Sequence, residues 1–218
     1  MVFFIRKEKV EVIFAGLGNP GAEYERTKHN VGFRAIDVFA SEHIPKAKFR
    51  SRIGALALRG NLKGHEFLLA KPQNYMNNSG SIIKWLSRKY LTQEIVVIYD
   101  DMDLPPGRIR LANSGGSAGH KGMQSLIAVF KNEDVRRIRI GIGGRGDIEG
   151  AEYVLTPFSG DDALLAERAI ATTVLAMEDI LLNGFDKTMN KFNRKDIEEV
   201  LQKTEHDEPE KKKREDLD

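Results

Sequence analysis

The chain contains no cysteine among its 218 residues. It can therefore form no disulfide, use no thiol nucleophile and offer no thiolate ligand to a metal ion. Its five histidines, at positions 29, 43, 65, 120 and 206, show none of the spacings that are typical of histidine metal sites. These absences fit a reducing compartment, and they predict a protein without a bound metal.

A long apolar run is also missing. The N-terminal stretch MVFFIRKEKV has an apolar patch that is too short for a signal peptide or a membrane span. The hydrophobic content of 41% is nevertheless enough for a sizeable core. We therefore expect a cytoplasmic protein with an N-terminal extension at 1–9, one folded domain at 10–202, and a charged, disordered tail at 203–218.

The formal net charge is only +2, but it is unevenly distributed. The tail carries five basic and seven acidic residues, whereas residues 105–145 carry eight lysines or arginines and two acids. A local positive excess of this size suits a polyanionic partner. A solvated basic surface has the same composition, so the charge alone does not decide between the two interpretations.

Hydrophobic periodicity predicts alternating strands and helices. Strands are expected within 10–18, 53–72 (two strands with a turn at residues 60–64), 94–99, 108–112 and 136–144, and helices at 30–44, 78–91, 123–131, 161–183 and 187–193. Interleaved elements of this kind are typical of an α/β domain. The expected hairpin near residue 60 favours a single twisted, mixed sheet with helices on both faces.

Residues 16–21 (GLGNPG) match the G-x-G-x-x-G pattern of dinucleotide-binding loops. Pro20 removes a backbone N–H donor from the loop, and the predicted helix does not begin there. The acid that this motif requires about twenty residues later is also missing, because Asp37 lies inside a predicted helix. Residues 141–146 match the same pattern, which shows its low specificity. These features argue against a nucleotide cofactor.

Residues 115–119 (GGSAG) match the G-x-S-x-G pattern of serine hydrolases. The histidine of such a triad follows the serine in the chain, and only His120 and His206 follow Ser117. His120 is too close in sequence to turn back onto Ser117, and His206 lies in the expected tail. A serine esterase is therefore a rival interpretation that lacks a suitable base.

Polar side chains follow several of the predicted strands. They are Asn19, Tyr24 and His29 after the first strand, Tyr75, Asn77 and Asn78 after the strand that ends near Lys71, Asp100 after 94–99, and His120 and Lys121 after the glycine-rich loop. A neutral histidine can take a proton from water, an aspartate can orient it, and asparagine can donate to an oxyanion. Each residue alone also fits a turn or a helix cap. The prediction of a site depends on these loops meeting at one rim of the sheet.

At these residues the sequence resembles the bacterial-type peptidyl-tRNA hydrolases. The matching stretches, in the order of the family, are GLGNPGAEYERTKHNVGF, KPQNYMNNSG, DDMDLPPGRIRL, GGSAGHKGMQSL, RRIRIGIG and YVLTPF, and they span roughly residues 10–195. The resemblance implies a single-domain α/β fold of the peptidyl-tRNA hydrolase or phosphorylase-like type. It also implies a monomeric carboxylic-ester hydrolase of translation and ribosome rescue, which releases peptide from the 3′-end of tRNA without a metal or cofactor.

The resemblance also assigns roles to residues. It implies that His29 is the general base for a hydrolytic water and that Asp100 orients it. Asn19 would favour N-acylated chains over free aminoacyl groups. Asn77 would bind the peptide or the 3′-end and assist the oxyanion.

The remaining assignments concern substrate binding. Tyr24 and Tyr75 would line the cleft, and Arg110 and Arg139 fall where the family contacts tRNA phosphates. Lys121 stands where the family usually has asparagine, and unlike asparagine it can only donate hydrogen bonds. We expect Lys121 to contact a phosphate or carbonyl of the substrate. Two further alternatives remain. A non-catalytic RNA-binding module would bind tRNA without turnover, and a nucleotide-dependent oxidoreductase would show saturable NAD(P) binding.

Overall fold

The computed structural model describes residues 9–193 except 53, 93, 132–133, 145 and 147–148. The expected extension at 1–9, apart from Lys9, and the tail at 203–218 lie outside the described residues. The strands are β1 (Val12–Gly16), β2 (Arg50–Arg52), β3 (Ala55–Leu62), β4 (His65–Pro72), β5 (Ile95–Asp101), β6 (Ile109–Ala112) and β7 (Arg136–Gly141). The α-helices are α1 (Val31–His43), α2 (Ser79–Lys89), α3 (Lys121–Phe130), α4 (Gly150–Tyr153), α5 (Asp161–Asn183) and α6 (Phe185–Phe192), and short 3₁₀ helices are η1 (Ala22–Tyr24), η2 (Lys28–Asn30) and η3 (Met76–Asn78).

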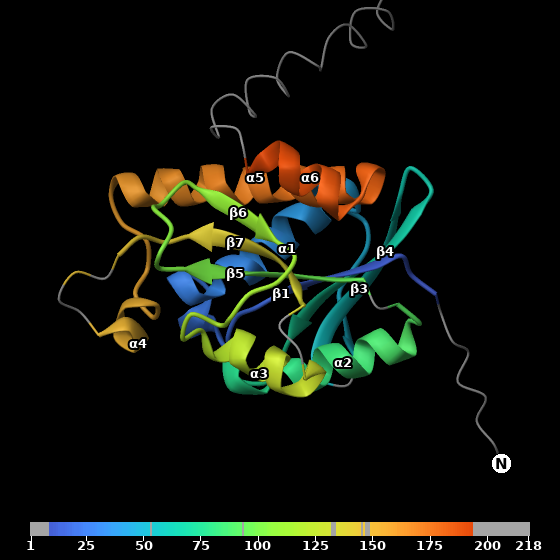
Figure 1. Cartoon of the computed structure of the whole chain (residues 1–218), viewed down its shortest axis with the longest axis horizontal. Coiled ribbons are helices and arrows are strands. Elements are labelled where there is room, and N and C mark those ends of the chain that lie inside the picture. Colours follow the sequence, from blue (N-terminus) through green and yellow to red (C-terminus); the bar gives the residue numbers. More distant parts are fainter. Residues whose placement is uncertain are drawn as a thin grey trace, which may run out of the picture.

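The strands form one sheet in the order β2-β3-β4-β1-β5-β7-β6. The pairs β4–β1, β1–β5 and β5–β7 are parallel, whereas β2–β3, β3–β4 and β6–β7 are antiparallel. The helices α5 and α6 cover one face, and α2 and α3 cover the other (Figure 1). The predicted α/β fold, with a mixed sheet between helices, is confirmed.

The central strand β1 shows why both faces are covered. Val12 and Phe14 pack into the core under α1, α5 and α6, and Ile13 and Ala15 pack into the core over α2 and α3. All four side chains are buried, because successive strand residues point to opposite faces and both faces carry helices.

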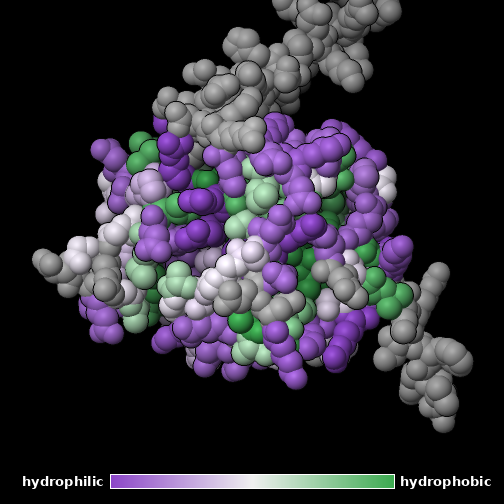
Figure 2. All heavy atoms as spheres, viewed as in Figure 1, coloured by the Kyte–Doolittle hydropathy of each residue, from purple (hydrophilic) through white to green (hydrophobic). Residues whose placement is uncertain are grey.

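Hydrophilic side chains dominate the surface over α5 and α6 (Figure 2). No helix in the described ranges is long and apolar enough to cross a bilayer.

Gly16 and Gly18, two of the glycines within residues 16–21, allow close packing of α1 on the sheet. A Cβ atom on Gly16 would lie 2.4 Å from the carbonyl oxygen of Gly32 in α1, and one on Gly32 would lie 2.3 Å from the carbonyl oxygen of Ile98. A Cβ on Gly18 would meet the Phe33 ring at 2.7 Å. Contact between helix and strand thus explains these glycines without a bound nucleotide.

Some local expectations differ from the structure. Gly60, expected in the hairpin turn, lies within β3, and the turn falls at Lys63 and Gly64. The strand β5 extends through Asp101, so that Asp100 is a strand residue rather than a loop residue. Asn78 stands at the N-cap of α2, but its side chain makes no capping hydrogen bond. Neither β2 nor α4 was predicted, because three or four residues are too few to show a period.

Candidate active site

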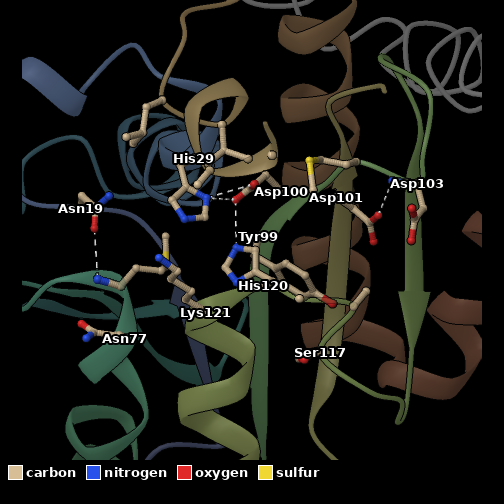
Figure 3. Close-up of a pocket in the computed structure, with 18 of the residues that line it drawn as sticks. Asn19, His29, Asn77, Tyr99, Asp100, Asp101, Asp103, Ser117, His120 and Lys121 are labelled. Carbon is tan, nitrogen blue, oxygen red and sulfur yellow. Dashed lines mark hydrogen bonds and ion pairs between the residues drawn. The ribbon is translucent and has the colours of Figure 1, made fainter. Parts of the chain in front are cut away.

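The carboxyl ends of β4, β1 and β5 lie side by side, and the loops that follow them surround a cavity of about 870 Å³. Its lining includes Asn19, His29, Tyr75, Asn77, Asp100, Ser117, His120, Lys121, Met102, Val154 and Leu155. Figure 3 shows His29, Asp100 and His120 pointing toward one another from different elements, with Asn19 and Lys121 nearby. The expectation that the polar loops meet at one rim therefore holds for most of the residues named from the sequence.

His29 lies on η2, directly before α1, and is buried with 8% exposure. Its Nδ1 lies 2.9 Å and 3.0 Å from the two carboxylate oxygens of Asp100. Its backbone N–H donates to the carbonyl of Val154 at 2.8 Å, which fixes the main chain at this point. Because Asp100 accepts at Nδ1, the ring carries its proton there and leaves Nε2 with a free lone pair.

His120 approaches the same carboxylate from the start of α3. Its Nε2 lies 3.0 Å from Asp100 (Figure 3), and its Nδ1 accepts the backbone N–H of Met123 at 3.3 Å. An Nδ1 that accepts carries no proton, so Nε2 holds the hydrogen and donates it to Asp100. The two imidazoles thus have opposite tautomers. Both donate to one carboxylate, but Nε2 of His29, unlike either nitrogen of His120, has no hydrogen-bond partner among the described residues.

The carboxylate of Asp100 is buried, and burial by itself raises its pKa. The charges and hydrogen bonds of His120 and His29 outweigh burial and hold the pKa of Asp100 well below its usual range. Asp100 is therefore ionised throughout the neutral range. A permanent negative charge at this position stabilises the proton that His29 gains when it acts as a base.

One ring nitrogen from each of His29 and His120 and one carboxylate oxygen of Asp100 lie within 4.8 Å of one another, a grouping that also suits a metal ion. A metal bound at Nε2 of His120 would require the proton to move to Nδ1, where the N–H of Met123 already points. The hydrogen bonds therefore favour a carboxylate with two donors over a metal centre.

Asn19 is held from two sides. Asn30 accepts the backbone N–H of Asn19 at 2.8 Å and donates to its carbonyl at 2.9 Å. The side-chain Oδ1 of Asn19 accepts the N–H of Met76 at 3.0 Å. With Oδ1 occupied, the amide Nδ2 is the group that Asn19 can offer to a molecule in the cavity.

The opposite part of the lining comes from η3 and α3. Tyr75 is 66% exposed, and Asn77 and Lys121 are exposed as well. Lys121 is the first residue of α3, where the helix dipole disfavours a positive charge. Among the residues that the structure describes, no acid forms an ion pair with Lys121. Helix stability therefore does not explain this lysine, and its ammonium is available to the cavity.

Three predicted binding residues lie away from the cavity lining. Tyr24 is half-buried on η1. Arg110 is exposed on the edge strand β6, directly opposite Arg139 on β7. Arg139 forms an ion pair with the buried Asp101. Burial lowers the pKa of Arg139, but the hydrogen bond and the charge of Asp101 outweigh burial, so that the pKa is raised overall. The assignments of these residues to the substrate remain predictions.

The structure does not support the alternative of a serine esterase that uses Ser117 as its nucleophile. Ser117 lines the cavity, but both nitrogens of the neighbouring His120 ring are engaged, by Asp100 and by Met123. Two contacts were not predicted from the sequence, namely that of His120 with Asp100 and that of Asn30 with the main chain of Asn19. Asn30 directly follows His29 and His120 directly precedes Lys121, so proximity to the other candidates was the available signal.

Comparisons with known proteins place the chain in a family. A family profile described as "Peptidyl-tRNA hydrolase" matches residues 13–200. A relative of that name from Carboxydothermus hydrogenoformans is 43% identical over 189 residues, which cover 84% of this chain and 98% of the relative. One from Persephonella marina is 41% identical over 83% of this chain and 96% of the relative. The crystal structure of peptidyl-tRNA hydrolase from Acinetobacter baumannii matches with a TM-score of 0.79 and 30% identity, over 86% of this chain and 96% of that one.

Proposed function

The chain belongs to the peptidyl-tRNA hydrolase family, and from this premise we propose that it hydrolyses the ester bond between a peptide and the 3′-end of tRNA, through a water activated by His29. The observation that carries the mechanism is the asymmetry of the two imidazoles on Asp100. His29 alone has a free ring nitrogen at the cavity. The same proposal has the enzyme acting as a cytoplasmic monomer on the products of translation.

The reaction follows from this arrangement. Nε2 of His29 removes a proton from water, and the resulting hydroxide attacks the ester carbonyl. The negative charge moves to the carbonyl oxygen, and Asp100 stabilises the imidazolium. When the tetrahedral intermediate collapses, the bond to the ribose oxygen breaks. The imidazolium then returns its proton to that oxygen, which leaves free tRNA and a peptide carboxylic acid that loses its remaining proton to solvent.

The amides select and stabilise the acyl group. The Nδ2 of Asn19 is free to donate to a carbonyl of the peptide, because its Oδ1 is fixed by Met76. A free aminoacyl group has no such carbonyl beyond the ester and brings a positive charge instead. Asn77, on the neighbouring η3, supplies a second neutral donor for the developing oxyanion or the 3′-end. Tyr75 offers an exposed ring beside it.

Lys121 replaces the usual asparagine with a cation. It cannot hold a water by accepting a hydrogen bond, but it can pair with a phosphate near the 3′-end or with a carbonyl of the substrate. We expect Lys121→Ala to raise KM several-fold. Lys121→Asn tests whether the family's asparagine is interchangeable here. Unchanged KM and kcat in Lys121→Ala would remove Lys121 from the site.

The decisive experiment is single-turnover hydrolysis of an N-acetyl-aminoacyl-tRNA, with free aminoacyl-tRNA as the matched control substrate. We expect fast cleavage of the blocked substrate only, and its loss in His29→Ala. A well-folded wild type that binds tRNA without cleaving it would indicate a binding module instead. Inactivation by a serine-directed covalent inhibitor would support the rival based on Ser117.

A further inference from the structure

Lys28 immediately precedes the proposed base and is only 5% exposed, which is unusual for a lysine. Its ammonium donates to the hydroxyl of Thr156 and to the carbonyl of Pro157, both at 2.8 Å. It also lies 4.6 Å from the centre of the Tyr153 ring and 5.4 Å from that of Phe158. All four partners belong to residues 153–158, the segment that begins in α4 and follows it.

The main chain makes the same connection. The N–H of Lys28 donates to the carbonyl of Thr156 at 3.0 Å, and the N–H of His29 donates to that of Val154 at 2.8 Å. Thr27 and Pro157 form an isolated antiparallel bridge. Val154 and Leu155 line the cavity, so the segment bound by Lys28 is one wall of the active site.

Burying an ammonium is costly, and an apolar side chain would fill the same space without that cost. Burial lowers the pKa of Lys28, and the charge of Asp162 offsets this only in part. The hydrogen bonds and the aromatic rings hold the cation in place of water. The chemical step has no use for this group, because His29 and Asp100 complete the base.

We propose that Lys28 is a positioning residue that locks the cavity wall at residues 153–158 onto the main chain of His29, and thereby sets how tightly the acyl end of the substrate is held. The inference rests on the proposed function, since the wall has a role only if this cavity binds the substrate. A loosened wall would move Val154 and Leu155 relative to the base. Binding of the substrate would weaken more than the proton transfer itself.

Lys84 offers a matched control on the other side of the molecule. Its ammonium also donates to a main-chain carbonyl, that of Val129 at 2.6 Å, and lies 5.7 Å from the centre of the Phe130 ring. It joins α2 to the far end of α3 and does not line the catalytic cavity. Lys28→Met and Lys84→Met therefore remove the same kinds of contact with the same substitution.

The test is steady-state hydrolysis of N-acetyl-aminoacyl-tRNA by both variants and by Lys28→Arg. For Lys28→Met we expect KM to rise about tenfold with a smaller change in kcat, for Lys84→Met unchanged kinetics, and for Lys28→Arg partial recovery. Equal kinetics in the two methionine variants would overturn the proposal. If Lys28→Met does not fold, Thr156→Val removes one acceptor and is expected to raise KM more modestly; an unchanged KM there would also count against it.

Hydrogen exchange supplies a readout that does not depend on activity. The amide protons of Lys28 and His29 should exchange faster in Lys28→Met than in wild type, while Lys84→Met leaves them unchanged. If these amides stay protected in Lys28→Met, Lys28 does not hold residues 153–158 against the main chain of His29, even if the enzyme is active. If wild type does not hydrolyse the substrate but the exchange result is as expected, the proposed function is wrong, and the contact of Lys28 with residues 153–158 has a structural role only.

Discussion

The buried centre of the site and its basic rim use polar residues in opposite ways. In the buried centre, formed by His29, Asp100, His120, Asn19 and Asn30, each side chain has a defined partner on the protein. The basic rim is formed by the exposed Lys121 and Arg110 and by Arg139, which is paired with the buried Asp101, and both arginines lie outside the cavity lining. We therefore expect the centre to position the reacting groups and the rim to attract a polyanionic substrate. Substitutions in the two regions should therefore have different signatures.

The largest effect is expected for His29→Ala. Removing a general base costs about a thousandfold in kcat, within the range for such groups, while KM should change little. Single-turnover rates with saturating enzyme measure this directly. A loss of less than about tenfold would mean that another group activates the water.

Asp100→Asn should follow closely, with a loss in kcat of about a hundredfold or more. The amide can turn its NH₂ group toward Nδ1 of His29 and favour the tautomer that places the proton on Nε2, where it blocks the base. Rates measured beside those of His29→Ala should be similar in size. Full activity in Asp100→Asn would contradict the orienting role.

The pH dependence of stability gives a second test of Asp100. Its pKa in the folded chain lies below the ordinary value of about 3.8, so the unfolded chain takes up the proton first as the pH falls. The stabilisation is therefore complete above about pH 4 and is lost as the pH falls toward the lower folded-state pKa. In Asp100→Asn, the free energy of unfolding should decline less steeply between about pH 4 and pH 2 in denaturant titrations. An equally steep decline would assign the acid sensitivity to other carboxylates.

A smaller effect is expected for His120→Ala, because His120 acts through Asp100 and does not face the water as a base. We expect a loss of about tenfold in kcat, together with some destabilisation of α3, since the cap on Met123 is also removed. His120→Asn is a useful companion, because asparagine can cap the helix. If both variants lose as much as His29→Ala, the distinction between the imidazoles is wrong.

The smallest effect is expected on the basic rim. Arg110→Ala should raise KM by a few-fold at low salt. It should also make the slope of the logarithm of the tRNA-binding constant against the logarithm of the salt concentration shallower by about one. The same measurement on His29→Ala should show the wild-type slope. An unchanged slope in Arg110→Ala would return the basic segment to the interpretation of a solvated surface.

Much of the fold could be predicted because its elements have clear periods. The helix α5 begins and ends at the predicted residues, 161 and 183, and β4 ends at Pro72 as expected. The four residues of α4 could not be predicted, since a single turn has no amphipathic pattern. The hairpin turn was misplaced because Gly60 looks like a turn residue, whereas in the structure it makes room for the Phe67 ring.

The site was predicted only as far as local patterns allow. His29 and Asp100 were found through strand ends and the family resemblance, yet their contact joins residues 71 positions apart. The hydrogen bond from His120 to Asp100 joins residues that are separated in the chain by β6, and no sequence spacing predicts it. The role of Lys28 depends on residues 153–158, more than a hundred positions away, so it appears only when the chain is folded.

The mechanism depends on Asp100 accepting one N–H hydrogen bond from each imidazole, which leaves Nε2 of His29 as the free base. The most direct measurement is the ¹⁵N NMR spectrum of imidazole-labelled protein at neutral pH, assigned with single histidine variants. We expect the two rings to have opposite tautomers, with the proton on Nδ1 of His29 and on Nε2 of His120. A proton on Nε2 of His29 would contradict it, because the proposed base would then have no lone pair to accept a proton from water.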